Sequence, residues 1–119
     1  AEGCNLLGYV DSLDSFYRDI SVIAAPYITG GGVRIKVLEA MARALPLVTT
    51  ATGARGLPAH DGLNCFIRET TNDFAEALLR LVSDNALATL FSSAARAAIE
   101  REHDEVAAAA ALRRFVLGP

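Results

Sequence analysis

The chain has 119 residues, which is enough for one compact domain and too few for two. Hydrophobic residues make up 52% and charged residues 21%, a composition that excludes a disordered chain. The formal net charge of −3 argues against a nucleic-acid partner, which would need a positive surface for its phosphates. No apolar run approaches the roughly 18 residues of a membrane span.

The first half of the chain predicts strands alternating with helices. A short strand is expected over residues 5–10, and a helix follows with Asp11 or Ser12 as its N-cap. Residues 20–25 form a continuous apolar run rich in β-branched side chains, closed by Pro26. Such a run is typical of a fully buried parallel strand.

The second half continues this alternation and ends in helices. A glycine-rich loop over 27–32 precedes a helix over about 33–44, whose apolar residues recur at spacings of three and four. Short strands are expected over 47–50 and 64–68, with a loop over 52–58 between them. Three helices complete the chain. Thr71 is expected to cap the first, the second starts at Asp84 or Asn85, and the third runs from about His103 to Val116.

This order predicts an α/β domain over residues 1–119, with a partial Rossmann-like parallel sheet of three to four strands. Helices flank the sheet, and a helical tail follows it. Doubly wound sheets usually have about five or six strands, so this one would expose an edge strand. An exposed edge and a mean hydropathy of +0.30 favour self-association through that edge.

The glycine loop is the segment most able to bind a ligand. It joins the carboxyl end of a buried strand to a helix N-terminus, and ligands of open α/β sheets bind at that edge. Gly30, Gly31 and Gly32 permit close backbone approach, and free amides at the helix start attract a phosphate. Arg34 and Lys36 add positive charge where the helix dipole disfavours it, which a bound anion would explain. A tight turn without a ligand is the alternative, since the spacing matches neither a P-loop nor a dinucleotide fingerprint.

Glu39 lies one turn further along this helix. A surface ion pair with Lys36 or Arg43 is one interpretation of its carboxylate. The other is that the carboxylate faces the cleft and accepts hydrogen bonds from two vicinal hydroxyls, such as those of a ribose.

The whole stretch resembles the C-terminal domain of the family 4 (group 1) retaining glycosyltransferases, which have the GT-B fold. The resemblance covers nearly the whole chain, and its most characteristic part is G-V-R-I-K-V-L-E-A-M-A at residues 32–42. Further matching segments in order are Gly8–Leu13 with Phe16 and Tyr17, Asp19–Pro26, Leu45–Thr50, Gly53–Leu57 and Asp61–Ile67.

The resemblance implies a donor-binding role in an enzyme that moves a sugar from a nucleotide diphosphate sugar to an acceptor, in polysaccharide or glycolipid synthesis. The family motif has two glutamates, of which the second binds the nucleotide ribose and matches Glu39. The first would contact the donor sugar, but Gly31 occupies its position. The implied substrate-binding residues are Gly30, Gly31, Gly32, Val33, Arg34, Ile35, Lys36 and Glu39. No catalytic residue, cofactor or metal is implied, and neither cysteine, Cys4 or Cys65, has a zinc-site spacing.

The resemblance also implies a partner domain and a location. The family's N-terminal domain, which holds the acceptor, and the start of the donor domain have no counterpart in these residues. We therefore expect a fragment of a bacterial enzyme that is inactive alone. The isolated cysteines favour a cytoplasmic setting, and lipid-linked acceptors would bring the parent enzyme to the inner face of the membrane. A non-catalytic structural or oligomerising module without ligand affinity stays open as the alternative.

Overall fold

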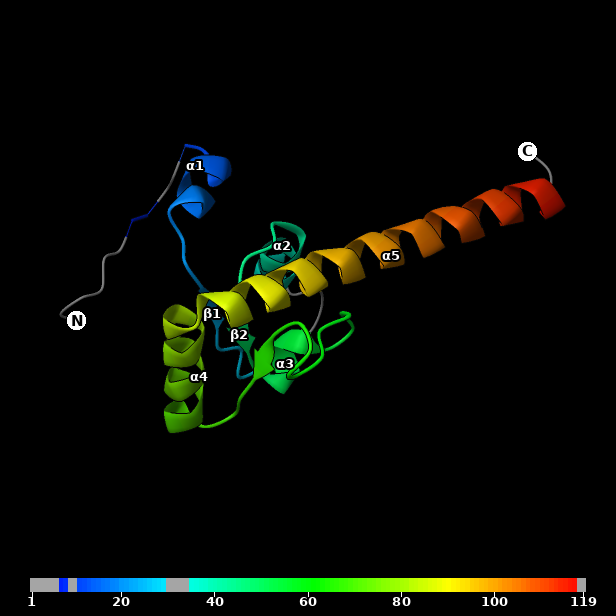
Figure 1. The fold of residues 1–119 in the computed structure, drawn as a ribbon. Coiled ribbons are helices and arrows are strands. Elements are labelled where there is room, and N and C mark those ends of the chain that lie inside the picture. Colours follow the sequence, from blue (N-terminus) through cyan, green and yellow to red (C-terminus); the bar gives the residue numbers. More distant parts are fainter. Residues whose placement is uncertain (1–6, 9–10, 30–34, 118–119) are drawn as a thin grey trace.

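The computed structural model describes residues 7–8, 11–29 and 35–117; of residue 13 and residues 103–117 it describes only the backbone. Helices and strands alternate through most of this part of the chain (Figure 1). In chain order they are α1 (Leu13–Arg18), β1 (Ile23–Ala25), α2 (Ile35–Ala42), β2 (Leu47–Thr49), α3 (Ala51–Ala54), β3 (Phe66–Ile67), α4 (Thr71–Ser83) and α5 (Asn85–Leu117).

The three strands form one parallel sheet in the order β1–β2–β3. Ile23 lies opposite Leu47, and Val48 lies opposite Phe66. The predicted α/β class and the small parallel sheet are confirmed, although each strand is shorter than its apolar run. β1 is an edge strand of the sheet formed by the described residues. Four of the six residues of the strand expected over 5–10 fall outside the described residues, and the other two, Leu7 and Gly8, lie in no strand.

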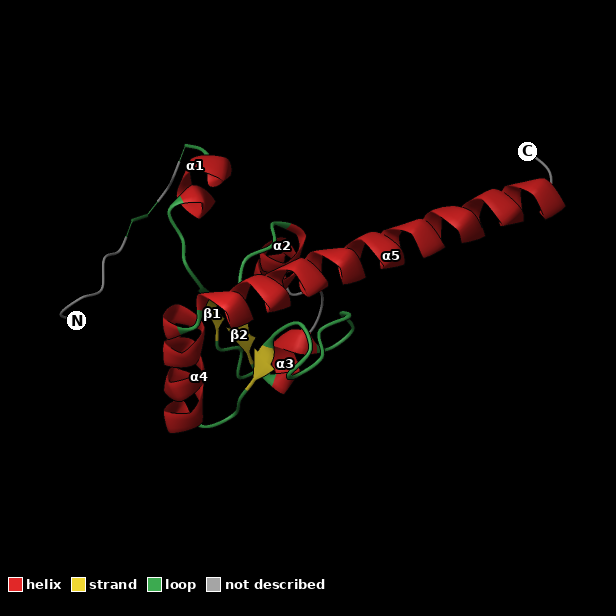
Figure 2. Ribbon diagram, viewed as in Figure 1, coloured by secondary structure: helices red, strands yellow, loops and turns green. Residues whose placement is uncertain are grey.

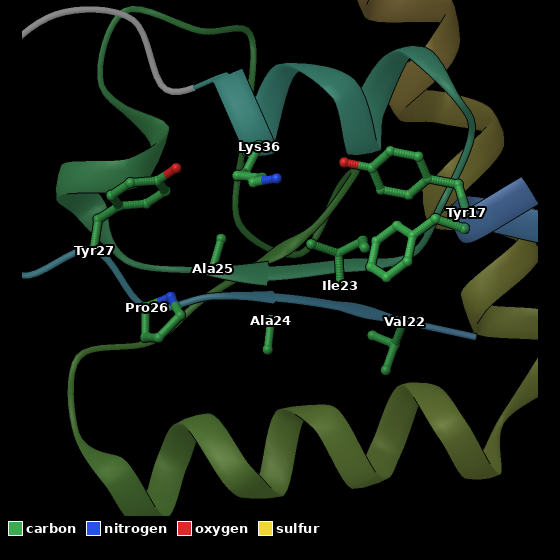
Figure 3. Close-up of a pocket in the computed structure, with 9 residues that line it drawn as sticks. Tyr17, Val22, Ile23, Ala24, Ala25, Pro26, Tyr27 and Lys36 are labelled. Carbon is green, nitrogen blue, oxygen red and sulfur yellow. The ribbon is translucent and has the colours of Figure 1, made fainter. Parts of the chain in front are cut away.

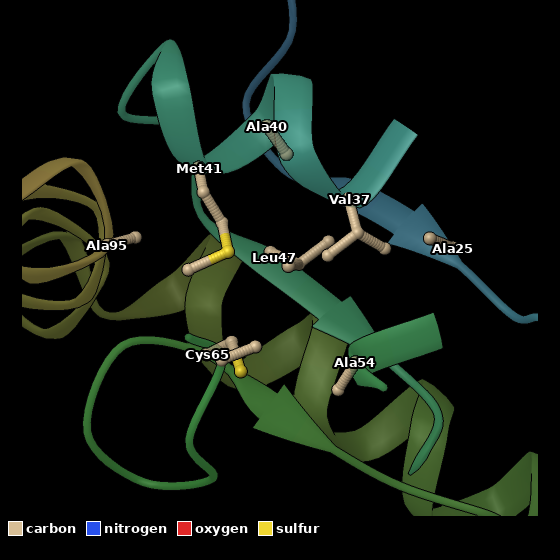
Figure 4. Close-up of a cluster of buried hydrophobic side chains, with 9 residues drawn as sticks. Ala25, Val37, Ala40, Met41, Leu47, Ala54, Cys65 and Ala95 are labelled. Carbon is tan, nitrogen blue, oxygen red and sulfur yellow. The ribbon is translucent and has the colours of Figure 1, made fainter. Parts of the chain in front are cut away.

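Helices α2 and α5 cover one face of the sheet. The side chains buried there form the α2-face cluster, in which Val37 and Met41 of α2 meet Leu47 of β2 and Ala95 of α5 (Figure 4). Its buried members are Ala25, Val37, Ala40, Met41, Leu47, Ala54, Ala59, Cys65 and Ala95. The three buried residues of α2, Val37, Ala40 and Met41, recur at helical spacing, so they face this cluster together.

Helix α4 covers the opposite face (Figure 2). The side chains buried there form the α4-face cluster: Val48, Phe66, Ala77, Leu81, Ala88 and Phe91. Val48 belongs to this cluster whereas its neighbour Leu47 belongs to the other, because successive strand residues point to opposite faces. The first turns of α5 contribute to the α4-face cluster and its middle to the α2-face cluster, so one helix connects both.

The C-terminal region differs from the prediction of three helices. Residues 85–117 form one continuous helix of 33 residues. The boundary expected near His103 was wrong, because the charged and alanine-rich residues there favour helix and no glycine or proline interrupts them. The second half of α5 extends beyond the rest of the described chain (Figure 1).

One helix cap and one short helix differ from the prediction, and another cap agrees with it. Helix α4 begins at Thr71, but its N-cap is Thr70, whose side chain accepts a hydrogen bond from the Asp73 amide. The loop expected over 52–58 contains α3, which Thr50 caps in the same way. The N-cap of α1 is Ser12, one of the two residues expected to cap that helix.

Candidate functional site

The predicted site surrounds the carboxyl end of β1 and the first turns of α2. Gly30, Gly31, Gly32, Val33 and Arg34 lie outside the described residues. Ile35 and Lys36 form the first turn of α2 and are both exposed, whereas Glu39 is half-buried. Lys36 and Glu39 are three residues apart, so the helix places them on one face.

A pocket of about 410 Å³ lies along the edge of β1 that has no partner strand among the described residues, and we call it the edge pocket. Lys36 reaches into it from α2, between the rings of Tyr17 and Tyr27 (Figure 3). Its lining residues are Phe16, Tyr17, Val22, Ile23, Ala24, Ala25, Pro26, Tyr27 and Lys36. Lys36 makes no ion pair with any residue that the structure describes. Most of the lining is apolar, and Lys36 is the one cation among the described residues that line the pocket.

The Glu39 carboxylate is bound by Tyr17, which is not among the residues predicted for the site. The Tyr17 hydroxyl donates a hydrogen bond of 2.6 Å to Glu39 Oε2. Neither predicted ion pair of Glu39 is found among the described residues, since Arg43 pairs instead with Asp14 at 2.7 Å. No local sequence signal could have identified this contact, because the two residues are 22 positions apart and belong to different helices.

Tyr17 donates from a buried and enclosed position. Its ring is 4% exposed and packs edge-on against Phe16, with centroids 5.1 Å apart. The Arg43 guanidinium lies over the same ring, 4.6 Å from its centroid. Burial raises the pKa of Tyr17 to about 12, and the hydrogen bond to Glu39 acts in the same direction. The hydroxyl therefore stays neutral and donates to Glu39 Oε2.

Two threonines tie the end of β2 to the end of β1. Thr49 is fully buried and donates to the Ala25 carbonyl at 2.8 Å. Thr50 donates to the Tyr27 carbonyl at 2.5 Å and accepts from the Gly53 amide at 3.2 Å. These hydroxyls are satisfied by backbone groups and hold the segment that leads into the glycine loop.

A second hollow of about 550 Å³ lies between the loop 58–64 and α5. Asn64, which lines it, is 2% exposed and satisfied by the loop itself: it accepts from the His60 amide and donates to the Pro58 carbonyl, both at 2.8 Å. Among the described residues no three His, Cys, Asp or Glu side chains gather closely enough to hold a metal ion. Within the same residues no helix has the length and apolarity to cross a membrane.

Comparisons with known proteins give a family and a similar fold. The family model described as "Glycosyl transferases group 1" matches residues 1–84. The fold is similar to the 1.35 Å crystal structure of the C-terminal domain of a glycosyl transferase group 1 family protein (LpcC) from Francisella tularensis, with a TM-score of 0.70 and 22% identity. The alignment covers 82% of this chain and 52% of that one, so the chain spans about half of that domain. None of the curated proteins is similar enough to this sequence to count as a match.

Proposed function

Because this chain belongs to the group 1 glycosyl transferases, we propose that it holds the nucleotide diphosphate sugar donor of a sugar-transferring enzyme. One observation carries the proposal: Lys36 and Glu39, a cation and a carboxylate, lie on one face of α2, the helix that follows β1 in the chain. Ligands of open α/β sheets bind at that edge. A diphosphate needs a cation, and a ribose needs a carboxylate or similar acceptor.

Each end of the donor has a matching group in this proposal. The Glu39 carboxylate accepts hydrogen bonds from the ribose hydroxyls. The backbone amides of residues 31–35 and the charges of Arg34 and Lys36 contact the diphosphate and the sugar. The diphosphate gains negative charge as it leaves, so fixed donors at this position would stabilise the transition state. No residue of this chain is assigned a covalent or acid–base role.

We further propose that residues 1–119 are a portion of a GT-B donor domain that works with an N-terminal acceptor domain. The C-terminal domain matched in the crystal structure supports this arrangement. Retention of configuration, a role in polysaccharide or glycolipid synthesis and a location at the inner face of the membrane belong to the same proposal. Gly31 occupies the position of the first motif glutamate and has no carboxylate, so in this proposal backbone amides contact the donor sugar instead.

A titration of the chain with UDP, GDP and ADP, followed by amide NMR, tests donor binding. We expect shifts at Ile35, Lys36 and Glu39 with at least one of these nucleotides. Glu39→Gln should weaken that binding at least about tenfold, the size of a lost hydrogen bond to a charged group. Glu76→Gln is the matched control, since Glu76 is exposed on α4 at the other face. Equal binding by both variants would count against the role of Glu39.

Lys36 offers an independent readout because it is the only lysine of the chain. An amine-reactive acylating reagent modifies it and the N-terminal amine, which mass spectrometry separates. We expect bound nucleotide to slow acylation of Lys36 severalfold and to leave the N-terminus unaffected. Identical rates with and without nucleotide would contradict contact between Lys36 and the diphosphate.

A structural module that assembles through the sheet edge is the second candidate. The observation that favours it is the free edge of β1, which among the described residues pairs only with β2 and could pair with a second copy of the chain. Sedimentation velocity distinguishes the two, since edge pairing predicts dimers at high protein concentration. A strict monomer that shifts with nucleotide would exclude this candidate.

A further inference from the structure

Tyr17 is not among the residues proposed to contact the nucleotide sugar. Its hydroxyl, however, donates a hydrogen bond to Glu39, the residue proposed to bind the ribose. The donor of this bond comes from α1 and its acceptor from α2, over 2.6 Å. This distance is at the short end for an O–H donor and is typical of a charge-assisted bond to a carboxylate. Glu39 is therefore not a free surface side chain but one whose carboxylate is already held at one oxygen.

The donor is itself fixed in place. The Tyr17 ring is enclosed by Phe16 on its edge and by the Arg43 guanidinium over its face. Arg43 is held in turn by its ion pair with Asp14 of α1. These contacts restrict the rotation of the Tyr17 side chain. The hydroxyl is therefore held in one place, and its hydrogen bond holds Glu39 Oε2 beside it. Figure 3 shows the hydroxyl directed toward α2.

We propose that Tyr17 is a positioning residue, which orients the Glu39 carboxylate toward the ribose of a bound nucleoside diphosphate. This inference rests on the proposed donor site. The hydroxyl occupies one lone pair of Oε2 and leaves Oε1 and the remaining lone pair of Oε2 as acceptors for two vicinal hydroxyls. A carboxylate ordered before binding loses less conformational entropy when the ligand arrives.

A purely structural role for Tyr17, pinning α1 to α2, predicts a different pattern. In that case loss of the hydroxyl changes the stability of the fold and affects all ligands of the site equally. A positioning role affects only ligands that contact the Glu39 carboxylate. The ribose hydroxyls therefore decide between the two, because removing them from the ligand removes the contact while the diphosphate remains.

The experiment compares the 119-residue chain with its Tyr17→Phe variant. Each is titrated by amide NMR with UDP, GDP and ADP and with their 2′,3′-dideoxy counterparts. We expect the variant to bind the ribonucleotides about fivefold more weakly, the size of one net hydrogen bond, and the dideoxynucleotides less than twofold more weakly. An equal loss for both ligand types, no loss, or tighter binding would overturn the proposal.

Two further variants separate this inference from the proposed function. Asp14→Asn breaks the ion pair with Arg43 while leaving the Tyr17 hydroxyl in place, so it controls for looser docking of α1. Glu39→Gln tests the site itself. If Glu39→Gln weakens ribonucleotide binding and Tyr17→Phe does not, only the positioning role is wrong. If no nucleotide shifts any resonance of the wild-type chain, the donor site and the inference fail together.

A measurement on the wild-type chain covers the case in which Tyr17→Phe does not fold. Carbon-13 labels report the Glu39 carboxyl and the Tyr17 Cζ during the same titrations. Coupled shifts of both signals with the ribonucleotide, and of neither with the dideoxynucleotide, would support the positioning role. A Glu39 signal that moves while Tyr17 Cζ does not would overturn it.

Discussion

Gly53 lies within α3, the short helix that follows β2, and a larger residue there would clash with its neighbours. A Cβ atom at this position would come within 2.1 Å of Thr49 Oγ1 and 3.0 Å of Tyr27 Cδ2. The Thr49 hydroxyl cannot move away freely, because it is buried and bonded to the Ala25 carbonyl. The single methyl group that glycine lacks would therefore disturb the connection between β1 and β2.

We expect Gly53→Ala to lower the free energy of unfolding by about 1–3 kcal/mol, the usual cost of overpacking a core. Urea denaturation of the wild type and the variant measures it. The control is the same substitution in a Thr49→Ala background, where the nearest atom is removed. The cost of Gly53→Ala should be smaller there, and an equal cost in both backgrounds would rule out this clash as the cause.

Cys65 gives the fold a dependence on alkaline pH. Its thiol is fully buried, and burial, assisted by the negative charge of Asp61, raises its pKa from 9.0 to about 11. Above pH 9 the unfolded chain loses this proton while the folded chain keeps it. The stabilisation is therefore complete below pH 9 and is lost as the pH rises toward about 11.

The free energy of unfolding should fall by on the order of 2 kcal/mol between pH 9 and about 11 because of Cys65. Urea denaturation across this range, for the wild type and for Cys65→Ala, isolates the effect. The variant retains Cys4 and Tyr17, so their ionisation cancels in the comparison. Parallel curves for the two proteins would contradict this account of the thiol.

At the scale of a single element, α2 is followed by a residue, Ala44, whose backbone conformation is unusual for a residue other than glycine. Ala44 has a φ of 56°, in the left-handed region that glycine adopts most easily. The amides of Ala44 and Leu45 bond back to the carbonyls of Met41 and Ala40, the pattern of a Schellman motif. Pro46 follows and prevents any continuation of the helix.

Ala44→Gly should raise the free energy of unfolding by about 0.5–1 kcal/mol, because it relieves the strain of the left-handed conformation. The matched control is Ala42→Gly, two residues earlier in α2 and exposed. That substitution should lower the same free energy by about 1 kcal/mol, since glycine weakens a regular helix. Thermal unfolding of the two variants is the measurement, and destabilisation by both would contradict the cap.

At the scale of the whole molecule, α5 joins the two clusters on opposite faces of the sheet. Ala88 and Phe91 of this helix belong to the α4-face cluster, and Ala95 belongs to the α2-face cluster. Phe91 packs edge-on against Phe66 of β3, with ring centroids 4.9 Å apart. The two faces should therefore unfold together rather than one after the other.

Phe91→Ala tests this connection. We expect a loss of about 3–5 kcal/mol, much of the total stability of a small domain. Native-state hydrogen exchange should show reduced protection at Leu81 in one cluster and at Met41 in the other. Leu90→Ala is the control, because the neighbouring side chain is 64% exposed and should change protection little. Reduced protection confined to α4 would show that the faces are independent.

The sequence by itself determined the local structure and the family. The continuous apolar run before Pro26 specified β1, the helical spacing after the glycine loop specified α2, and residues 32–42 carried the family motif. These features follow from side chains that are close along the chain, so patterns of period two or 3.6 reveal them. The placement of Lys36 and Glu39 on one helix face could be predicted in the same way.

Only the tertiary structure decided which groups meet across elements. It paired Tyr17 with Glu39, placed the Thr49 hydroxyl on the Ala25 carbonyl, and left little room for a side chain at Gly53. It also let α5 run unbroken across both faces of the sheet, which its weak amphipathic pattern did not indicate. The physical reason is that such contacts depend on how separate elements pack, and no periodicity within one element encodes the position of another.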